Sequence, residues 1–187
     1  SSDLGLACAL VYQDGMFVQA VTRGDGLVGE DVTANVRTIR TVPLSLRTDP
    51  VVQHLTEGRT EVRGEIVMYR QDFEQLNKQR AEEGQTLFAN PRNTAAGTIR
   101  QLDSSLVASR KLYFLAYDIQ RDDVLDTPSH HETYDFLARL GFGGTQYAKP
   151  LKDVAAIHEY FHYWNTAREK LPYNIDGLVI KLDDRQL

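Results

Sequence analysis

The chain has 187 residues, of which 42% are hydrophobic and 25% charged, and its formal net charge at pH 7 is −5. This length fits one sizeable domain, and the composition is that of a soluble globular protein. The acidic balance excludes a general polyanion binder, so contacts with nucleic acid would need a local group of arginines. The one cysteine, Cys8, excludes an internal disulfide and a cysteine zinc cluster. Because no apolar run has membrane-spanning length and no signal peptide is recognisable, we expect a cytoplasmic protein.

The start of the chain predicts a hairpin followed by a short helix. Residues 6–12 and 16–22 are mostly apolar, and Asp14-Gly15 between them is a strong turn signal. A short helix is expected within residues 31–40, because Pro43 follows and would stop it.

A strand and two helices are predicted next. Residues 60–69 alternate in the manner of a strand. One predicted face carries Val62, Gly64, Ile66 and Met68, and the other carries Glu61, Arg63, Glu65 and Val67. Helical spacing extends over residues 71–83 and ends at Gly84, and Pro91 marks the first turn of another helix.

The second half of the chain predicts two strands and two helices. Residues 111–119 form a strongly apolar strand. A capping box at residues 129–132 opens a helix that Gly141 ends, and a longer helix covers residues 153–170. Residues 177–182 are expected to form a buried strand.

The order of these elements predicts the fold class. The strands come in hairpin-like pairs, and the helices are interspersed without a regular βαβ rhythm. We therefore predict an α+β fold with mainly antiparallel sheets and flanking helices. The polar segment 121–127 is the best internal break, but apolar elements continue on both sides of it. Residues 1–187 are accordingly interpreted as a single domain.

Two charged residues lie in strand-like segments. Lys181 shares a predicted face with Gly177 and Val179, and a lysine in so apolar a strand needs a polar cleft or a route to solvent. A phosphate would suit this compact cation, and the strand pattern leaves both readings open. Glu65 could accept hydrogen bonds from ribose hydroxyls, although a cross-strand ion pair is the commoner role of such a carboxylate.

The motif RGDG at residues 23–26 combines an arginine with two glycines. The glycines indicate a tight turn after a strand, which would aim Arg23 into a cleft. The first three residues of this motif, Arg-Gly-Asp, also occur in cell-adhesion sites. Such a role would need an exposed extracellular loop, and the rest of the sequence shows no sign of secretion.

Two more arginines, Arg92 and Arg100, lie in or next to the helix that is predicted to begin near Pro91. Asn93, Gly97 and Arg100 recur at helical spacing and share one face. Arg92 and Arg100 could make bidentate contacts with phosphates. A solvated amphipathic helix is the alternative.

Residues 158–162 read HEYFH and match the zinc-binding pattern His-Glu-x-x-His. On a helix His158 and His162 would share one face, with Glu159 as the general base of a peptidase. The helix argues against this alternative, because the two histidines lie on its polar side. The apolar stripe expected on the opposite side consists of Val154, Ile157, Phe161 and Trp164. No third ligand is evident, so we assign no metal ligand.

Residues 87–103, LFANPRNTAAGTIRQLD, resemble the segment that marks the adenylation domain of bacterial NAD-dependent DNA ligases. The blocks RGDG at 23–26, EVRGE at 61–65 and IDGLVIK at 175–181 occur in the order and rough spacing of that family. Four matching blocks in one chain are far more specific than any single motif. The part FANPRN is typical of the NAD-using branch rather than of related ligases that use ATP.

The resemblance implies a nucleotidyltransferase fold and a self-adenylating enzyme. Such a ligase takes AMP from NAD with Mg²⁺, passes it to a 5′-phosphate at a nick in double-stranded DNA, and seals the nick with the 3′-hydroxyl. The residues implied to line the adenylate pocket are Arg23, Glu65 and Lys181, with Asp176 in a supporting place. Those implied to contact phosphate or DNA are Arg92, Arg100 and Arg168. We expect a monomer that binds nicked duplex DNA and no membrane.

The family's nucleophilic lysine has no counterpart here. Its motif is Lys-x-Asp-Gly, whereas this chain reads Ser2-Asp3-Leu4-Gly5, with Ser2 in the place of the lysine. The attack on the α-phosphorus needs a neutral amine, so we identify no catalytic residue and expect this chain not to ligate alone. A foreign extension, a discontinuity in the chain, an altered site or a naturally inactive relative would each explain Ser2.

The resemblance covers only the middle of the parent enzyme, so we interpret the chain as a truncated adenylation domain. Zinc is expected only in a domain outside this chain. A non-catalytic module that binds nucleotide or DNA is the alternative function.

Overall fold

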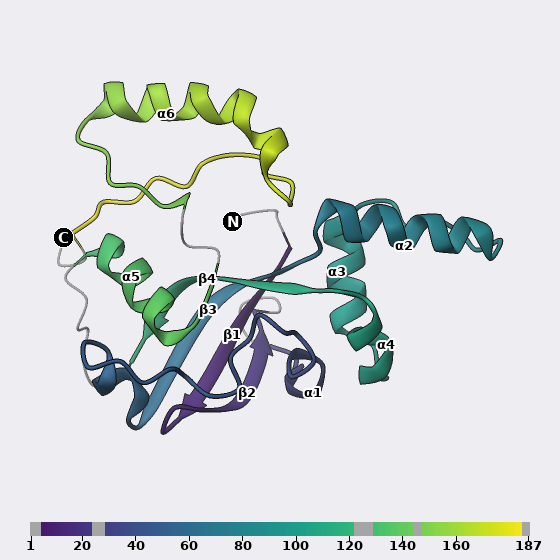
Figure 1. Cartoon of the computed structure of the whole chain (residues 1–187), viewed down its shortest axis with the longest axis horizontal. Coiled ribbons are helices and arrows are strands. Elements are labelled where there is room, and N and C mark those ends of the chain that lie inside the picture. The colour runs from purple at the N-terminus through teal and green to yellow at the C-terminus, as the bar shows by residue number, and fades with distance from the viewer. Residues whose placement is uncertain (1–4, 24–28, 122–128, 144–146, 185–187) are drawn as a thin grey trace.

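The computed structural model describes residues 5–23, 29–121, 129–143 and 147–184. Four strands form one antiparallel sheet in the order β2-β1-β3-β4 (Figure 1). They are β1 Leu6–Gln13, β2 Met16–Thr22, β3 Arg59–Val67 and β4 Tyr113–Gln120. Helices flank this sheet, so the predicted α+β fold with antiparallel strands is confirmed.

The helices are α1 Thr33–Val36, α2 Arg70–Glu82, α3 Pro91–Ile99, α4 Ser104–Ser109, α5 His130–Leu140 and α6 Val154–Ala167, with 3-10 turns at Gln53–Thr56 and Arg168–Lys170. All except α4 lie where helices were predicted, although α1 is only four residues long. The six residues of α4 are too few to show helical periodicity in the sequence. Among the described residues, no helix has the length and apolar character that crossing a bilayer requires.

Side chains cap the starts of four described helices, and Asp103 does so for α4 by accepting the backbone N–H of Ser105. Asn90, Ser129 and Asp153 each accept the backbone N–H of the residue three positions later, which satisfies a donor that the helix itself leaves unpaired. At the other end, Gly141 has φ 106° and ends α5 in the left-handed conformation that favours glycine. These helix boundaries follow from local sequence, and the predicted capping box at Ser129 and helix end at Gly141 are confirmed.

The turn of the β1–β2 hairpin has the backbone that its sequence predicts. Asp14 has φ 49° and Gly15 has φ 74°, and positive φ at both positions is typical of a type I′ turn. The backbone N–H of Asp14 donates to the Gly58 carbonyl at 2.8 Å, and Asp14 Oδ1 accepts the Gly58 N–H at 2.8 Å. The turn is thereby tied to the chain just before β3.

The face of the sheet on which α5 packs holds the main core. β1 contributes Leu10 and Tyr12, β3 contributes Val62 and Ile66, and β4 contributes Phe114, all of them fully or almost fully buried. Buried leucines of α5 belong to the same cluster. The alternation predicted for β3 is confirmed, because the face that carries Val62 and Ile66 is the core face.

A smaller cluster lies against the opposite face. It is built on Trp164 and Ala167 of α6 and on Leu171 and Tyr173, and Leu115 of β4 packs against it. Figure 1 shows α6 and the segment that follows it on the side of the molecule away from α1. This cluster attaches the C-terminal part of the chain to the sheet.

The prediction of a buried strand at residues 177–182 is wrong. Within the described residues this segment is irregular, and Val179, Ile180 and Leu182 are 72%, 65% and 74% exposed. A strand needs a neighbour for its backbone N–H and C=O groups, and none of the four described strands pairs with this segment. The segment is held instead at its end, where the backbone N–H of His130 donates to the Asp183 carbonyl at 2.9 Å.

The apolar stripe predicted for α6 is only partly confirmed. Trp164 is buried as expected, but Val154 and Phe161 are 68% and 45% exposed. The buried side of α6 is the one that carries Trp164 and Ala167, and Tyr160 packs against the same cluster. The small cluster covers less of the helix than its apolar residues would allow, so part of the stripe faces outward.

We expect Gly64→Ala to destabilise the fold. A Cβ at this position would lie 2.4 Å from Cζ of Phe114 and 2.5 Å from the carbonyl oxygen of Leu115. Because relief requires moving a core ring or the backbone of β4, the free energy of unfolding should fall by about 1–3 kcal/mol. Urea unfolding followed by circular dichroism measures the change.

Gly97→Ala is the matched control for this substitution. A Cβ at Gly97 would meet no atom within 4 Å, and alanine favours a helix by roughly 1 kcal/mol over glycine. The control should therefore keep or raise the free energy of unfolding. Equal stabilities of the two variants would contradict the packing described for Gly64.

We also expect Cys8 to resist alkylation while the protein is folded. Burial raises the pKa of its thiol from 9.0 to about 12, against a smaller lowering by a hydrogen bond with the backbone of Val21. The thiolate is the reactive form, so iodoacetamide at about pH 8 should label the unfolded chain far faster than the folded one. The burial of the neutral thiol stabilises the fold below about pH 9, and this contribution is lost as the pH rises toward 12. Mass spectrometry reads the labelling, and rapid labelling of the folded chain would refute the expectation.

Candidate functional site

Glu65 lies at the centre of the sheet on the face opposite the main core. Its register partners are Ala7 on β1 and Leu115 on β4, and residues paired across antiparallel strands share a face. Glu65 is only 5% exposed. The carboxyl group of Glu65 therefore lies between a small and a larger apolar side chain on this face of the sheet.

A β-bulge places Tyr117 near Glu65. Arg63 pairs with Asp118 and Gly64 pairs with Ala116, so Tyr117 is the extra residue of β4. A bulge changes the direction in which a side chain points. Burial raises the pKa of Tyr117, and so does the negative charge of Glu65, whereas the positive charges of Arg63 and Arg23 lower it. These charges therefore act on the Tyr117 hydroxyl from nearby.

Lys181 reaches the same place from the C-terminal segment. Its Nζ lies 5.7 Å from the centroid of the Tyr117 ring, a distance at which a cation is attracted to an aromatic face. The side chain is exposed, so the charge stays hydrated while it sits over the ring. The two roles left open for Lys181 both stay predictions, because its ammonium group lies near Tyr117 and its side chain also reaches solvent.

Arg23 follows the last residue of β2. Its backbone N–H donates to the Ala7 carbonyl at 3.1 Å, which brings Arg23 beside the strand position that pairs with Glu65. Of the predicted RGDG turn, residues 24–26 lie outside the described residues. The described chain continues at Gly29, where a Cβ would lie 2.1 Å from the Thr22 carbonyl oxygen. Only a glycine can therefore pack this closely against the end of β2.

The position predicted for the nucleophile, Ser2, lies outside the described residues. The described chain begins at Gly5, where a Cβ would lie only 2.0 Å from the Ile66 carbonyl oxygen. Glycine therefore lets the chain enter β1 in close contact with β3, one residue from Glu65. Asp176 is exposed, and its supporting place in an adenylate pocket stays a prediction.

The arginines of α3 lie on its exposed side. Asn93, Gly97 and Arg100 are all exposed, which agrees with the shared face predicted for them, and Arg92 is exposed as well. Arg100 Nε lies 2.6 Å from the Oε2 atom of Glu30, and both side chains of this ion pair are largely exposed. Such pairs contribute little to stability, so Arg100 can exchange this carboxylate for another anion.

Arg168 occupies the 3-10 turn after α6 and lies 3.9 Å from the carboxylate of its neighbour Glu169. Its side chain is about half exposed. Arg70 holds the same turn, because it donates to the Glu169 carbonyl at 2.8 Å and forms an ion pair with the Glu169 carboxylate at 2.9 Å. Arg168 therefore belongs to a different surface element from Arg92 and Arg100.

The segment leading into α3 is held by residues that the sequence did not single out. The side-chain amide of Asn77 accepts the Phe88 N–H at 2.8 Å and donates to the Phe88 carbonyl at 3.0 Å. The guanidinium carbons of Arg80 and Arg110 lie 4.3 and 5.2 Å from the centroid of the Phe88 ring. Tyr117 was missed as well, because an aromatic residue in an apolar strand does not signal a bulge.

The His-Glu-x-x-His motif lies on the exposed side of α6. His158, Glu159 and His162 are exposed, and the described residues contain no group of three ligand-type side chains that could hold a metal ion. This part of the protein thus offers two imidazoles at helical spacing without a third ligand beside them.

Comparison with known proteins gives the family of the chain. The model of the NAD-dependent DNA ligase adenylation domain family matches residues 3–187. A DNA ligase of Herpetosiphon aurantiacus is 45% identical over 180 residues, which cover 96% of this chain and 26% of the relative. A DNA ligase of Anoxybacillus flavithermus is 45% identical over 179 residues, 96% of this chain and 25% of the relative. The chain spans about a quarter of the length of these relatives, and it belongs to the family of NAD-dependent DNA ligase adenylation domains.

Proposed function

We propose that this chain is the nucleotide-binding core of a DNA ligase that adenylates itself from NAD, transfers AMP to a 5′-phosphate at a DNA nick, and seals the nick with the 3′-hydroxyl. The observation that supports this most directly is the meeting of Glu65, Tyr117 and Lys181 on one face of the sheet. Three segments far apart in sequence converge there, and their side chains match the three parts of an adenylate.

Each side chain suits one part of that ligand. Tyr117 offers an aromatic surface for the adenine base, and the buried carboxyl group of Glu65 can accept hydrogen bonds from ribose hydroxyls. Lys181 and Arg23 supply positive charge for the phosphates. Because Lys181 now lies over the Tyr117 ring, a base stacked on that face would move the ammonium group toward the phosphates.

The proposed reaction also needs a metal ion and a nucleophile. Bound Mg²⁺ would stabilise the negative charge that develops on the phosphates, and it is usually held largely by substrate phosphates and water. The tight contact of Gly5 with Ile66 brings the start of β1 against β3 beside Glu65. A serine at position 2 has no amine to attack phosphorus.

The proposed partner is nicked double-stranded DNA, bound by a monomer in the bacterial cytoplasm. Arg92, Arg100 and Arg168 are exposed, and their guanidinium groups can bind backbone phosphates in a bidentate manner. In this proposal Arg100 releases Glu30 when a phosphate takes its place.

A non-catalytic nucleotide-binding module is the second candidate, and Ser2 is the observation that favours it for this chain. The site around Glu65 would then bind AMP or NAD without forming a covalent bond. Both candidates predict nucleotide binding, and they differ only in the formation of an adduct.

We expect AMP binding to depend on Glu65 and Tyr117. Glu65→Gln removes the charge of the hydrogen-bond acceptor and should weaken binding about 10- to 100-fold, as for hydrogen bonds to charged groups. Tyr117→Leu should remove base stacking worth about 1–3 kcal/mol, whereas Tyr117→Phe should retain it. Isothermal titration calorimetry with AMP measures each affinity.

His158→Ala is the control, because His158 is exposed on α6 and belongs to the alternative zinc motif. It should bind AMP as the unchanged chain does. Unaltered affinity in both Glu65→Gln and Tyr117→Leu, with folds verified by circular dichroism, would rule out this location for the nucleotide.

We further expect no covalent adenylation of the unchanged chain. Intact mass spectrometry after incubation with NAD and Mg²⁺ should show an unaltered mass, because the position at which the resemblance implies the nucleophilic lysine is Ser2, which has no amine. A full-length DNA ligase from Herpetosiphon aurantiacus treated in parallel serves as the positive control. An AMP adduct on this chain, or sealing of a nicked duplex by it, would contradict the expectation.

A further inference from the structure

The segment of residues 40–47 crosses the core face of the sheet and is anchored along its length. Thr41 Oγ1 accepts the Phe114 N–H at 2.8 Å, and the Tyr12 hydroxyl donates to the Pro43 carbonyl at 2.8 Å. Further along, the Arg47 N–H donates to the Leu140 carbonyl of α5 at 3.1 Å. These bonds reach β1, β4 and α5, so the side chains of this segment are presented from a fixed backbone.

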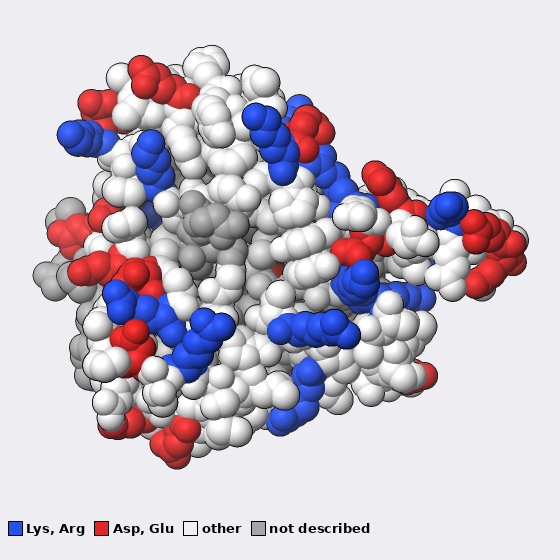
Figure 2. Space-filling view, viewed as in Figure 1, with Lys and Arg blue, Asp and Glu red and all other residues white. Residues whose placement is uncertain are grey.

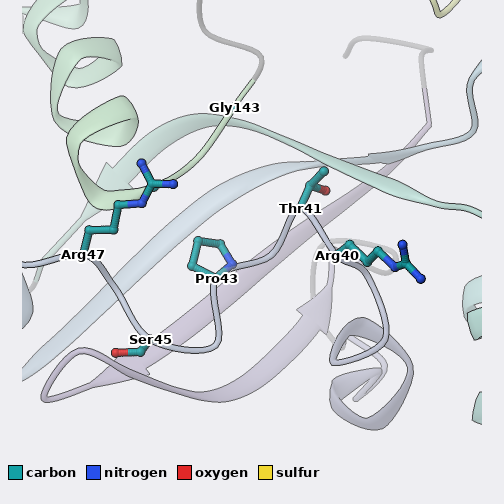
Figure 3. A pocket seen from close by; sticks show the side chains of 7 residues that line it. Arg40, Thr41, Pro43, Ser45, Arg47 and Gly143 are labelled. Carbon is teal, nitrogen blue, oxygen red and sulfur yellow. The ribbon is translucent and has the colours of Figure 1, made fainter.

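The anchored segment borders a pocket of about 260 Å³. Two arginines, Arg40 and Arg47, and two hydroxyl residues, Thr41 and Ser45, are part of its lining, and no carboxylate is. In Figure 3 the two guanidinium groups lie at opposite ends of the segment, with Thr41, Pro43 and Ser45 between them. The lining therefore offers hydrogen-bond donors and positive charge at two separated points.

The arginines of this pocket differ in their partners from an arginine nearby on α5, Arg139. Within the described residues no carboxylate lies within ion-pair distance of Arg40 or Arg47, whereas Arg139 pairs with Asp49 and Asp135. The chain has 26 acidic and 21 basic residues, so acidic partners are plentiful, and their absence from the described surroundings of Arg40 and Arg47 leaves this charge for an outside group. Figure 2 shows Lys and Arg side chains in a row across the middle of the face seen in Figure 1.

Gly141 explains how Arg47 is held at the pocket. A Cβ on Gly141 would lie 3.2–3.3 Å from the Nε, Cδ and Cγ atoms of Arg47, so the arginine stem packs across this glycine. The C-terminal end of α5 carries partial negative charge and favours one nearby cation. This effect can explain why a positive charge lies at Arg47. Arg40 lies at the other end of the segment, so the end of α5 does not explain its positive charge.

We propose that the pocket of Arg40 and Arg47 is a second nucleic-acid contact, which binds successive phosphates of a duplex DNA backbone. The guanidinium groups of Arg40 and Arg47 lie apart, which suits an extended polyanion. A single free phosphate would be bound better by donors that converge on one point. The pocket lies on the core side of the sheet, whereas Glu65 lies on the opposite face. The choice of DNA as the partner rests on the proposed ligase function, but the contact is separate from the proposed nucleotide site.

The test compares paired charge-removing variants by fluorescence anisotropy with a labelled DNA duplex at several salt concentrations. Arg40→Gln/Arg47→Gln keeps much of each stem and removes both charges. Binding should weaken severalfold, and the slope of log affinity against log salt should become shallower by roughly 0.9 for each phosphate that is no longer bound. Arg59→Gln/Arg139→Gln is the matched control, because it removes two arginines that already have acidic partners and should leave the slope nearly unchanged.

Several outcomes would overturn the proposal. These are an absence of DNA binding by the unchanged chain, an equal weakening in both paired variants, or an unchanged slope in Arg40→Gln/Arg47→Gln. Displacement of DNA by inorganic phosphate at matched ionic strength would identify a free-phosphate site instead. If the Gln pair does not fold, Arg40→Lys/Arg47→Gln with Arg40→Gln/Arg47→Lys should each show half of the slope change.

AMP titrations on the same samples separate this inference from the proposed function. If Arg40→Gln/Arg47→Gln binds DNA more weakly but binds AMP normally, the result supports the pocket as a DNA contact and leaves the nucleotide site unaffected. Failure of the unchanged chain to bind AMP, with its DNA binding intact, would count against the nucleotide site alone.

Discussion

Alternation along β3 is the constraint on which the rest of this structure depends. Val62 and Ile66 point into the main core while Glu65, between them, points to the opposite face. A shift of the pairing by one residue would reverse every side chain of the strand and bury the carboxyl group in the core. The Asp14–Gly58 hydrogen bonds and the close contact of Gly64 with Phe114 hold the register that prevents this.

The candidate nucleotide site is a product of packing between distant segments. Glu65 comes from a central strand, Tyr117 from a bulge in the edge strand, and Lys181 from a segment without regular structure. The small cluster around Trp164 carries that last segment to the sheet. This cluster and the bonds at Asp183 hold the segment of Lys181 from outside the sheet, so the position of Lys181 depends on other contacts than that of Glu65.

Arginines serve two different purposes in this acidic chain. Some close structural contacts: Arg70 binds the turn after α6, and Arg139 binds Asp49 and Asp135. Others lie on surfaces that an outside anion can reach, as at Arg92 on α3 and at the pocket of Arg40 and Arg47. Net charge alone therefore describes this protein poorly, since the distribution of its cations decides where a polyanion could approach.

The sequence by itself determined the local features and the family. The Asp14-Gly15 turn, the caps at Asn90, Ser129 and Asp153, and the two faces of β3 follow from φ preferences, nearby hydrogen bonds and alternation within a few residues. Only the tertiary structure decided that residues 177–182 form no strand, that Tyr117 bulges toward Glu65, and that Arg40 and Arg47 lack acidic neighbours in the described chain. A strand, a bulge and an ion pair each require a partner from elsewhere in the chain, and no local pattern specifies where that partner lies.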